Sequence, residues 1–260
     1  VVTREKTLAK YQGKGEPDRG YTQAWAAMME ELDDGIGRLM EAANQLNSGE
    51  QTYIFFTADN GGRGTVPGGD TSRAATNTPL TGAKHSLYEG GIRVPFFVAG
   101  PGIEAGAVCR QPVVGYDFLP TFVDLAGGDV STLSDEIDGS SFLPLLRDPQ
   151  SESLQRSAEG IVFHRPARLF SAYRDGSHKL MLFWERNGQI ARRELFRLDS
   201  SPIEQGEDIA ARASEKADEM QSRLTGYLER VDADTPPPAK RANRQNRGRA
   251  KAKASPSSVN

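Results

Sequence analysis

Cysteine is almost absent from this sequence, because Cys109 is the single one among 260 residues. This excludes an internal disulfide framework and any zinc cluster built from cysteines, and we expect Cys109 to be a small buried hydrophobic residue. Long apolar runs are also missing, and a membrane-spanning helix needs about 20 mostly apolar residues. The first residues, VVTREKTLAK, have neither an initiator Met nor the apolar stretch of a signal peptide. We therefore expect the chain to be a portion of a longer protein.

What remains is typical of a soluble globular protein, with 37% apolar and 26% charged residues. The net charge of -3 hides an acidic body and a basic end, because residues 236–260 carry seven basic side chains and no acidic ones. These residues have no apolar periodicity, so 234–260 are predicted to be a disordered basic tail. A basic tail can hold nucleic acid or an anionic surface, but a solvated tail is the favoured interpretation, and no specific nucleic-acid partner is predicted.

Hydrophobic periodicity predicts an α/β arrangement in the first part of the chain. Apolar residues between positions 21 and 46 recur every three or four residues, which predicts an amphipathic helix. Residues 53–56 and 94–98 form short apolar runs of the kind found in a parallel sheet that is covered on both faces. A further helix is expected at 116–128, with Asp117 as its N-terminal cap.

The pattern changes near residue 160. Four strand-like runs follow, joined by the turn pairs Asp175-Gly176 and Asn187-Gly188, which predicts a small antiparallel sheet. One apolar stripe between residues 211 and 231 predicts a last helix that lies across this sheet. We therefore predict an α/β domain over 1–150 and an antiparallel-sheet subdomain with a helix over 151–233.

Asp59 and Asn60 stand where the first predicted strand ends and a polar loop begins. Asn60-Gly61 is a hairpin signal, but GRGTVPGGDTSRAATN offers no returning strand. A phosphate-binding glycine loop is excluded too, because Pro67 occupies the third glycine position and no helix follows. In open α/β sheets ligands bind beyond the carboxyl ends of the strands, and a carboxylate with an amide oxygen suits Ca²⁺ or Mg²⁺. The pair therefore fits part of a metal site whose other ligands come from elsewhere.

Lys84 lies in a second unusual stretch, NTPLTGAKHSLYEGGIRVPFF. A loop lysine is usually a solvated charge. Here glycines flank it and a strand follows, so we expect turns to fix its backbone and hence the direction of its ammonium group. A fixed ammonium beside a divalent cation forms an anion site.

Four blocks resemble, in order and spacing, the later part of type I sulfatases: FFTADNGG, NTPLTGAKHSLYEGGIRVPFFVAGPG, YDFLPTFVDLAG and DGSSFLPLL. The resemblance covers about residues 20–235 and includes RDGSHKLMLF and ELFRLD near the end. It implies an alkaline-phosphatase-like α/β/α sandwich, here partial, followed by a small antiparallel sheet with a C-terminal helix. It also implies a sulfuric ester hydrolase that cleaves aryl or carbohydrate sulfates and acts in the periplasm or outside the cell.

Residue by residue, the resemblance implies that Asp59 and Asn60 bind the metal, usually Ca²⁺, and that Lys84 contacts the sulfate group. His85 is a weaker candidate for a substrate contact, since a surface histidine is nearly as frequent there. The motif of Glu89, Gly90, Gly91 and Arg93 is interpreted as mainly structural. Structural or solvent-facing roles are expected for His164 and His178, although the C-terminal sheet of this family can border the substrate cleft.

The nucleophile of the family is missing from this chain. Such enzymes oxidise the first residue of Cys/Ser-x-Pro-x-Arg to formylglycine, whose hydrated aldehyde attacks sulfur. Pro-x-Arg occurs twice here, but the nucleophile position two residues before the proline holds Gly15 in one case and His164 in the other. Cys109 is followed by neither proline nor arginine at the required spacing. We expect formylglycine on a missing N-terminal portion and predict that this chain alone is inactive.

Two alternatives remain open. The fold also serves phosphate and phosphonate ester hydrolases, but Asn60 argues against a two-zinc site, because an amide oxygen is a poor zinc ligand. The missing nucleophile and the basic tail would also suit a non-catalytic sulfatase-like module. For the favoured hydrolase, the partner is a sulfated small molecule or a sulfated glycan.

Overall fold

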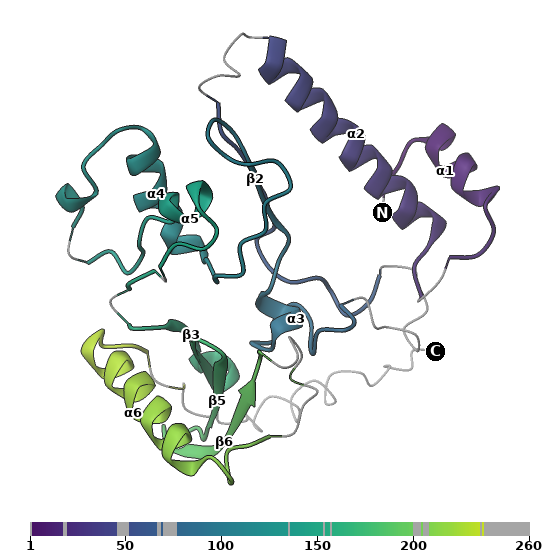
Figure 1. Cartoon of the computed structure of the whole chain (residues 1–260). Helices are drawn as coiled ribbons and strands as arrows, with labels where there is room; N and C mark the ends of the chain where they lie inside the picture. Colours follow the sequence, from purple (N-terminus) through teal and green to yellow (C-terminus); the bar gives the residue numbers. More distant parts are fainter. Residues whose placement is uncertain are drawn as a thin grey trace, which may run out of the picture.

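The computed structural model describes residues 2–17, 20–45, 52–66, 69, 77–134, 136–152, 154–156, 158–199, 204, 208–234 and 236. The predicted tail lies outside these residues from position 237 onward. Figure 1 shows an upper part, with α1, α2, β2, α4 and α5, and a lower part formed by a sheet and α6, with α3 between them. Within the described ranges, no helix has the length and hydropathy of a membrane span.

The chain opens with α1 (Glu5–Gln12) and α2 (Gln23–Gln45), which pack against each other. The long helix predicted at 21–46 is therefore confirmed. Its apolar stripe is only partly covered, however. Ala27 is fully buried, whereas Leu39 is 73% exposed.

The predicted strands at 53–56 and 94–98 exist as β1 (Ile54–Thr57) and β2 (Phe96–Ala99). The prediction of a parallel sheet buried on both faces is wrong for this pair, because β1 and β2 run antiparallel, with Ile54 opposite Ala99. One face packs on a cluster of phenylalanines: Phe55, Phe96, Phe118, Phe122 and Phe142. On the other face, Phe56 and Phe97 are 37% and 66% exposed.

The remaining elements of the upper part are α3 (Glu89–Ile92), η2 (Gly115–Asp117), α4 (Phe118–Leu125), η3 (Val130–Thr132) and α5 (Leu143–Arg147). The capping prediction for Asp117 is wrong. Its carboxylate makes no bond to the first turn of α4, and instead accepts a forked pair of hydrogen bonds from Arg156, at 2.9 and 2.6 Å. A bidentate charged pair is stronger than a single cap, and both side chains are buried. Cys109 is exposed, which corrects its expected burial.

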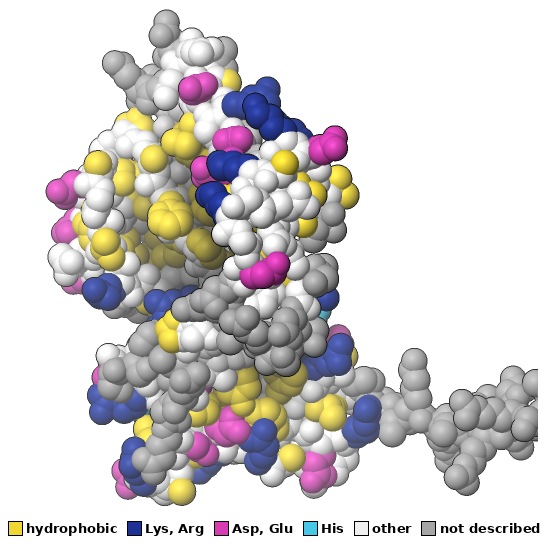
Figure 2. Space-filling model, turned by 90° about the vertical axis from the view of Figure 1, so that its right-hand side faces the viewer, with side chains coloured by type: hydrophobic (Ala, Val, Ile, Leu, Met, Phe, Trp, Pro, Cys, Tyr) yellow, Lys and Arg dark blue, Asp and Glu magenta, His cyan; other side chains and the backbone are white. Residues whose placement is uncertain are grey.

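Exposed apolar side chains gather on the upper part of the molecule (Figure 2). They come from α2, β1, β2 and α4: Met29, Leu32, Leu39, Met40, Phe56, Phe97, Leu119 and Phe122. The apolar patterns of these helices and strands therefore predict buried faces, but the described residues do not cover them.

The lower part is the antiparallel sheet predicted from the sequence. It consists of β3 (Ile161–Arg165), β4 (Phe170–Asp175), β5 (His178–Trp184) and β6 (Ile190–Arg197) in the order β3-β4-β5-β6, with η4 (Pro166–Arg168) between the first two strands. The helix α6 (Ser214–Arg230) packs on one face. The core between them contains Tyr173, Leu180, Leu182, Leu195, Ala217, Met220 and Leu224. This sheet and its helix are confirmed, while the division of the chain at residue 150 stays a prediction.

The other face of this sheet packs on the segment around α3. Because side chains alternate along a strand, Met181 points to the opposite face from Leu180 and Leu182. There it joins a buried cluster with Leu87, Ala172 and Phe196. Leu87 lies three residues after Lys84, so this cluster anchors the lysine-bearing segment on the sheet.

A buried ion cluster of Glu89, Arg174, Lys179 and Glu204 reinforces the same contact. The Lys179 ammonium donates to Glu89 at 2.9 Å and to Glu204 at 2.7 Å, and all three side chains are buried. Arg174 approaches the second oxygen of Glu89 at 3.3 Å. The backbone N–H of Glu89 also donates to Glu204, at 2.8 Å. These contacts give Glu89 a structural role and fix the start of α3 on the sheet.

Candidate functional site

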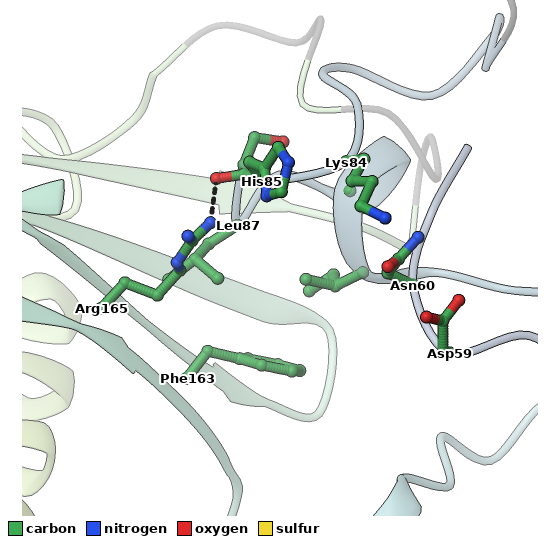
Figure 3. Close-up of a pocket in the computed structure, with 10 residues that line it drawn as sticks. Asp59, Asn60, Lys84, His85, Leu87, Phe163 and Arg165 are labelled. Atoms are coloured by element: carbon green, nitrogen blue, oxygen red, sulfur yellow. Dashed lines mark hydrogen bonds between the residues drawn. The ribbon is translucent and has the colours of Figure 1, made fainter. Parts of the chain in front are cut away.

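An open pocket of about 310 Å³ lies where the loop after β1, the segment before α3 and the strand β3 meet. Figure 3 shows side chains from all three. They include every site residue expected from the sequence. The lining is Asp59, Asn60, Lys84, His85, Ser86, Leu87, Gly91, Ile92, Phe163 and Arg165.

Backbone hydrogen bonds bring the loop after β1 and the lysine-bearing segment together. The N–H of Gly61 donates to the Gly91 carbonyl at 3.0 Å, and the N–H of Lys84 donates to the Gly62 carbonyl at 2.8 Å. The side-chain amide of Asn77 also donates to Gly62, at 2.8 Å. The expectation that turns hold the backbone of Lys84 is therefore confirmed, and the partner is the loop that carries Asp59 and Asn60.

Glycine is required where these two segments cross. A Cβ atom on Gly61 would lie 2.1 Å from the carbonyl oxygen of Gly90, a distance that real Cβ atoms essentially never show. Backbone, rather than a flexible side chain, blocks this position. The close approach that aligns Asn60 with Lys84 thus depends on a hydrogen at Gly61.

Replacing Gly61 with alanine should therefore lower the free energy of unfolding by about 1–3 kcal/mol, as overpacking of a tight contact does. Gly35→Ala is the matched control, because no heavy atom lies within 4 Å of a Cβ there. In the middle of α2 this control should stabilise the protein by about 0.5–1 kcal/mol. Urea unfolding followed by circular dichroism measures both. Equal stability of Gly61→Ala and the parent protein would contradict the proposed close approach.

The oxygen donors beside this crossing suit a hard cation in kind. Asn60 donates its amide N–H to the Gly61 carbonyl at 3.0 Å, which leaves its amide oxygen available to the pocket. Asp59 is exposed, and its carboxylate has no hydrogen bond or ion pair to any described residue. Within the part of the chain that the structure describes, no group of three or more His, Cys, Asp or Glu residues could hold a metal ion. Because Ca²⁺ takes six to eight oxygen ligands, the pair can supply only part of its shell.

Lys84 and His85 form the next stretch of the pocket wall. In Figure 3 the Lys84 amine points toward Asn60, and no described residue forms an ion pair with it. His85 has φ of 81°, in the left-handed region that is uncommon outside glycine but enriched for histidine. Its carbonyl oxygen accepts a hydrogen bond from Arg165. The roles of these residues stay predictions, but the structure brings all four predicted side chains to one pocket.

Phe163 and Arg165 are lining residues that the sequence did not reveal. They lie two positions apart on β3, so they share one face of the strand, and His164 faces the other way. The predicted strand IVFHR implies that alternate residues share a face, but nothing in the sequence indicates that this face meets a segment about 80 residues earlier. His164 instead contacts the Ser171 hydroxyl at 2.7 Å and the Asp234 carbonyl at 2.8 Å, which fits its expected structural role. His178 lies on β5, outside the pocket lining.

Tyr88 ties the same segment to the far edge of the sheet. Its hydroxyl donates to Glu194 at 2.7 Å. Burial, followed by this hydrogen bond to a carboxylate, raises the pKa of Tyr88 to about 12. The hydroxyl therefore stays protonated at neutral pH and keeps its role as a donor that positions the segment.

Comparison with known proteins gives two family matches. Residues 4–128 match the model of the Sulfatase family, and residues 83–234 match the model of N-sulphoglucosamine sulphohydrolase, C-terminal. The Steryl-sulfatase of Mus musculus is 32% identical over 158 residues, which are 60% of this chain and 24% of the relative. A protein of Formosa agariphila named Sulfatase is 28% identical over 267 residues, covering 90% of this chain and 45% of the relative.

Among solved structures, the crystal structure of Ps i-CgsB has a TM-score of 0.69 and 25% sequence identity. The likeness covers 90% of this chain and 48% of the other. It confirms the predicted α/β fold with an antiparallel sheet and a C-terminal helix. The chain spans less than half the length of each of these relatives.

Proposed function

This chain belongs to the sulfatase family, and from that premise we propose that it forms the sulfate-binding part of a sulfuric ester hydrolase. The observation that carries the proposal is the pocket that Asp59, Asn60 and Lys84 line together. The Asp59 carboxylate and the Asn60 amide oxygen can bind a cation, and the Lys84 ammonium has no ion pair among the described residues. Backbone hydrogen bonds fix the two segments that carry them, so the pocket suits a tetrahedral anion held beside a cation.

Each side chain has a distinct part in this proposal. Asp59 and Asn60 would bind a divalent cation together with other ligands outside this pair. Ca²⁺ is the proposed ion, and Mg²⁺ is the second candidate. When bound, the cation supplies Lewis-acid polarisation of the sulfuryl oxygens. Lys84 neutralises negative charge on those oxygens as the S–O bond to the alcohol breaks. His85 contacts the substrate from the adjoining wall.

The attacking group is proposed to be a formylglycine on a portion of the protein outside these 260 residues. Two facts support this. The chain spans less than half of its relatives, and Gly15, His164 and Cys109 do not meet the requirements of the modified motif. We therefore expect the chain alone to release no sulfate and the full-length protein to release it.

The substrate is proposed to be an aryl or carbohydrate sulfate. The names of the matches include a non-carbohydrate and a carbohydrate substrate, since one relative is named for a steryl sulfate and one family model for an N-sulphoglucosamine. By analogy with the family, we propose that the protein acts in the periplasm or outside the cell.

The direct test is sulfate release by the natural full-length protein from 4-nitrophenyl sulfate and from a sulfated glucosamine. Release from either substrate supports the proposal. Release of phosphate from the matching phosphate esters, with no sulfate release, would instead favour a phosphoester hydrolase. No release from any ester would favour a non-catalytic module.

Removal of the metal should abolish the activity, and Ca²⁺ should restore it. Because each protein oxygen contributes to a shell of six to eight, Asp59→Ala should weaken Ca²⁺ binding by at least about tenfold, a loss of roughly 1.4 kcal/mol. Calorimetric titration of the chelated protein with Ca²⁺ measures this. Asp129→Ala is the control, since Asp129 is exposed and its carboxylate accepts hydrogen bonds only from Ser131 among the described residues. Tight binding of Zn²⁺ in preference to Ca²⁺ would contradict the proposed donor set.

A further inference from the structure

We propose that Arg165 binds a second anionic group on the substrate, so that the pocket selects sulfated sugars that carry another sulfate or a carboxylate. This inference rests on the proposed function, because it concerns the same pocket. It assigns a role to a residue of the C-terminal sheet that the sulfate site itself does not need.

The charges of the lining favour a ligand with more than one negative group. Lys84 and Arg165 are cations, whereas Asp59 is the single carboxylate among the lining residues. Asp59 lies at the Lys84 end of the pocket, so a sulfate bound at Lys84 leaves the positive charge of Arg165 at the other end without a partner. A second anion on the same ligand would balance that charge.

Arg165 is free to bind such a group and is held in place to do so. One of its guanidinium nitrogens donates to the His85 carbonyl, and the guanidinium carbon lies 5.9 Å from the centre of the Phe170 ring. No carboxylate forms an ion pair with it in the described part of the chain. Since the fork has five N–H donors, several remain for a planar or tetrahedral anion.

The position of Arg165 separates it from the sulfate site. Figure 3 places His85 between Arg165 and Lys84, with Asn60 and Asp59 beyond the lysine. At about 310 Å³ the pocket reaches the size of sites that hold a small organic ligand, not only one sulfate group. Phe163 is only partly buried, lies along the pocket wall and offers apolar surface to a sugar ring. A sugar with anionic groups at both ends matches this layout.

The test compares substrates that differ in one anionic group. The full-length protein is given glucosamine with a single sulfate, glucosamine with two sulfates, and a singly sulfated disaccharide that contains a uronate. The parent should show a higher kcat/KM for both doubly anionic substrates. For each protein, kcat/KM for a doubly anionic substrate is divided by kcat/KM for the singly sulfated glucosamine. In Arg165→Gln this ratio should fall about 10- to 100-fold, mainly because KM for the doubly anionic substrate rises, as expected for loss of charged hydrogen bonds. The two doubly anionic substrates show whether sulfate or carboxylate is the preferred second group.

Arg165→Lys and Arg168→Gln sharpen the result. Arg165→Lys keeps the charge without the fork and should recover part of the ratio. Arg168 is exposed, three residues further on, and outside the lining, so Arg168→Gln should leave the ratio unchanged. An equal loss on all substrates in Arg165→Gln would mean that Arg165 only supports His85, and this would overturn the inference, as would an unchanged ratio.

The outcome is separable from that of the proposed function. If the parent protein releases no sulfate at all, calorimetric titration with the same sugars still reports their relative affinity and its dependence on Arg165. If sulfate is released but the ratio does not depend on Arg165, the hydrolase proposal stands and the second anion site fails.

Discussion

Lys84→Met should lower kcat/KM for sulfate release by about 10²–10³-fold, the usual cost of removing one group that stabilises charge in the transition state. The side chain is nearly isosteric but uncharged, so negative charge that builds on the sulfuryl oxygens loses its partner. A ground-state contact would raise KM alone, whereas a transition-state contact lowers kcat as well. Steady-state kinetics of the full-length protein distinguish the two.

Stability provides the internal control for this variant. The Lys84 ammonium has no ion pair among the described residues, so Lys84→Met should change the free energy of unfolding by less than about 0.5 kcal/mol. Lys14→Met is a matched control on the surface, because Lys14 is exposed and contacts the Tyr11 ring in the α1 region, away from the pocket. A Lys84→Met protein with normal kcat and kcat/KM would remove the lysine from the proposed mechanism.

Local patterns were sufficient to predict the elements near this site. The helix at 21–46, the four-stranded sheet and the last helix all follow from side-chain periodicity, which reflects the face that each element buries. Asp59, Asn60 and Lys84 were found by their chemistry at strand ends and in a glycine-rich turn. They meet in one pocket although about 20 residues separate them along the chain. A separation this short allowed the sequence to suggest that they act together.

Contacts over longer distances were not predictable in this way. The partner of a strand is decided by the whole fold, so the antiparallel pairing of β1 with β2 contradicted the parallel sheet expected from buried runs. Asp117 was assigned a local cap, but Arg156, 39 residues later, supplies a stronger partner. Arg165 reaches the pocket across 80 residues. In each case the residue contacts a partner far away in the sequence, and side-chain periodicity carries no information about such partners.

The buried ion cluster is a further case, because a strand lysine is usually exposed to solvent and nothing local in the sequence indicates the burial of Lys179. The structure instead buries it fully, between Glu89 and Glu204. A buried ammonium is tolerated only when carboxylates and hydrogen bonds compensate for the lost water. The sheet face that carries Lys179 is therefore fitted to α3, and it connects the stability of the sheet to the position of the pocket wall.

Lys179→Met should accordingly lower the free energy of unfolding by about 3–5 kcal/mol, because it leaves Glu204 buried without a cation, next to Glu89, which keeps only Arg174 at 3.3 Å. Urea unfolding of the full-length protein measures the loss. Lys216→Met is the matched control on α6. The Lys216 side chain is 29% exposed and pairs with Asp175 and Glu219, so its removal should cost at most about 1 kcal/mol.

A combined variant separates the charge of Lys179 from its packing. Lys179→Met with Glu204→Gln removes the carboxylate that has lost its cation, keeps the side-chain volume and leaves Glu89 paired with Arg174, so this variant should recover more than half of the loss. If Lys179→Met alone costs no more than Lys216→Met, the cluster does not connect α3 to the sheet. The wall of the pocket would then depend on the apolar contacts of Leu87 and Met181 and on the hydrogen bond from Tyr88 to Glu194.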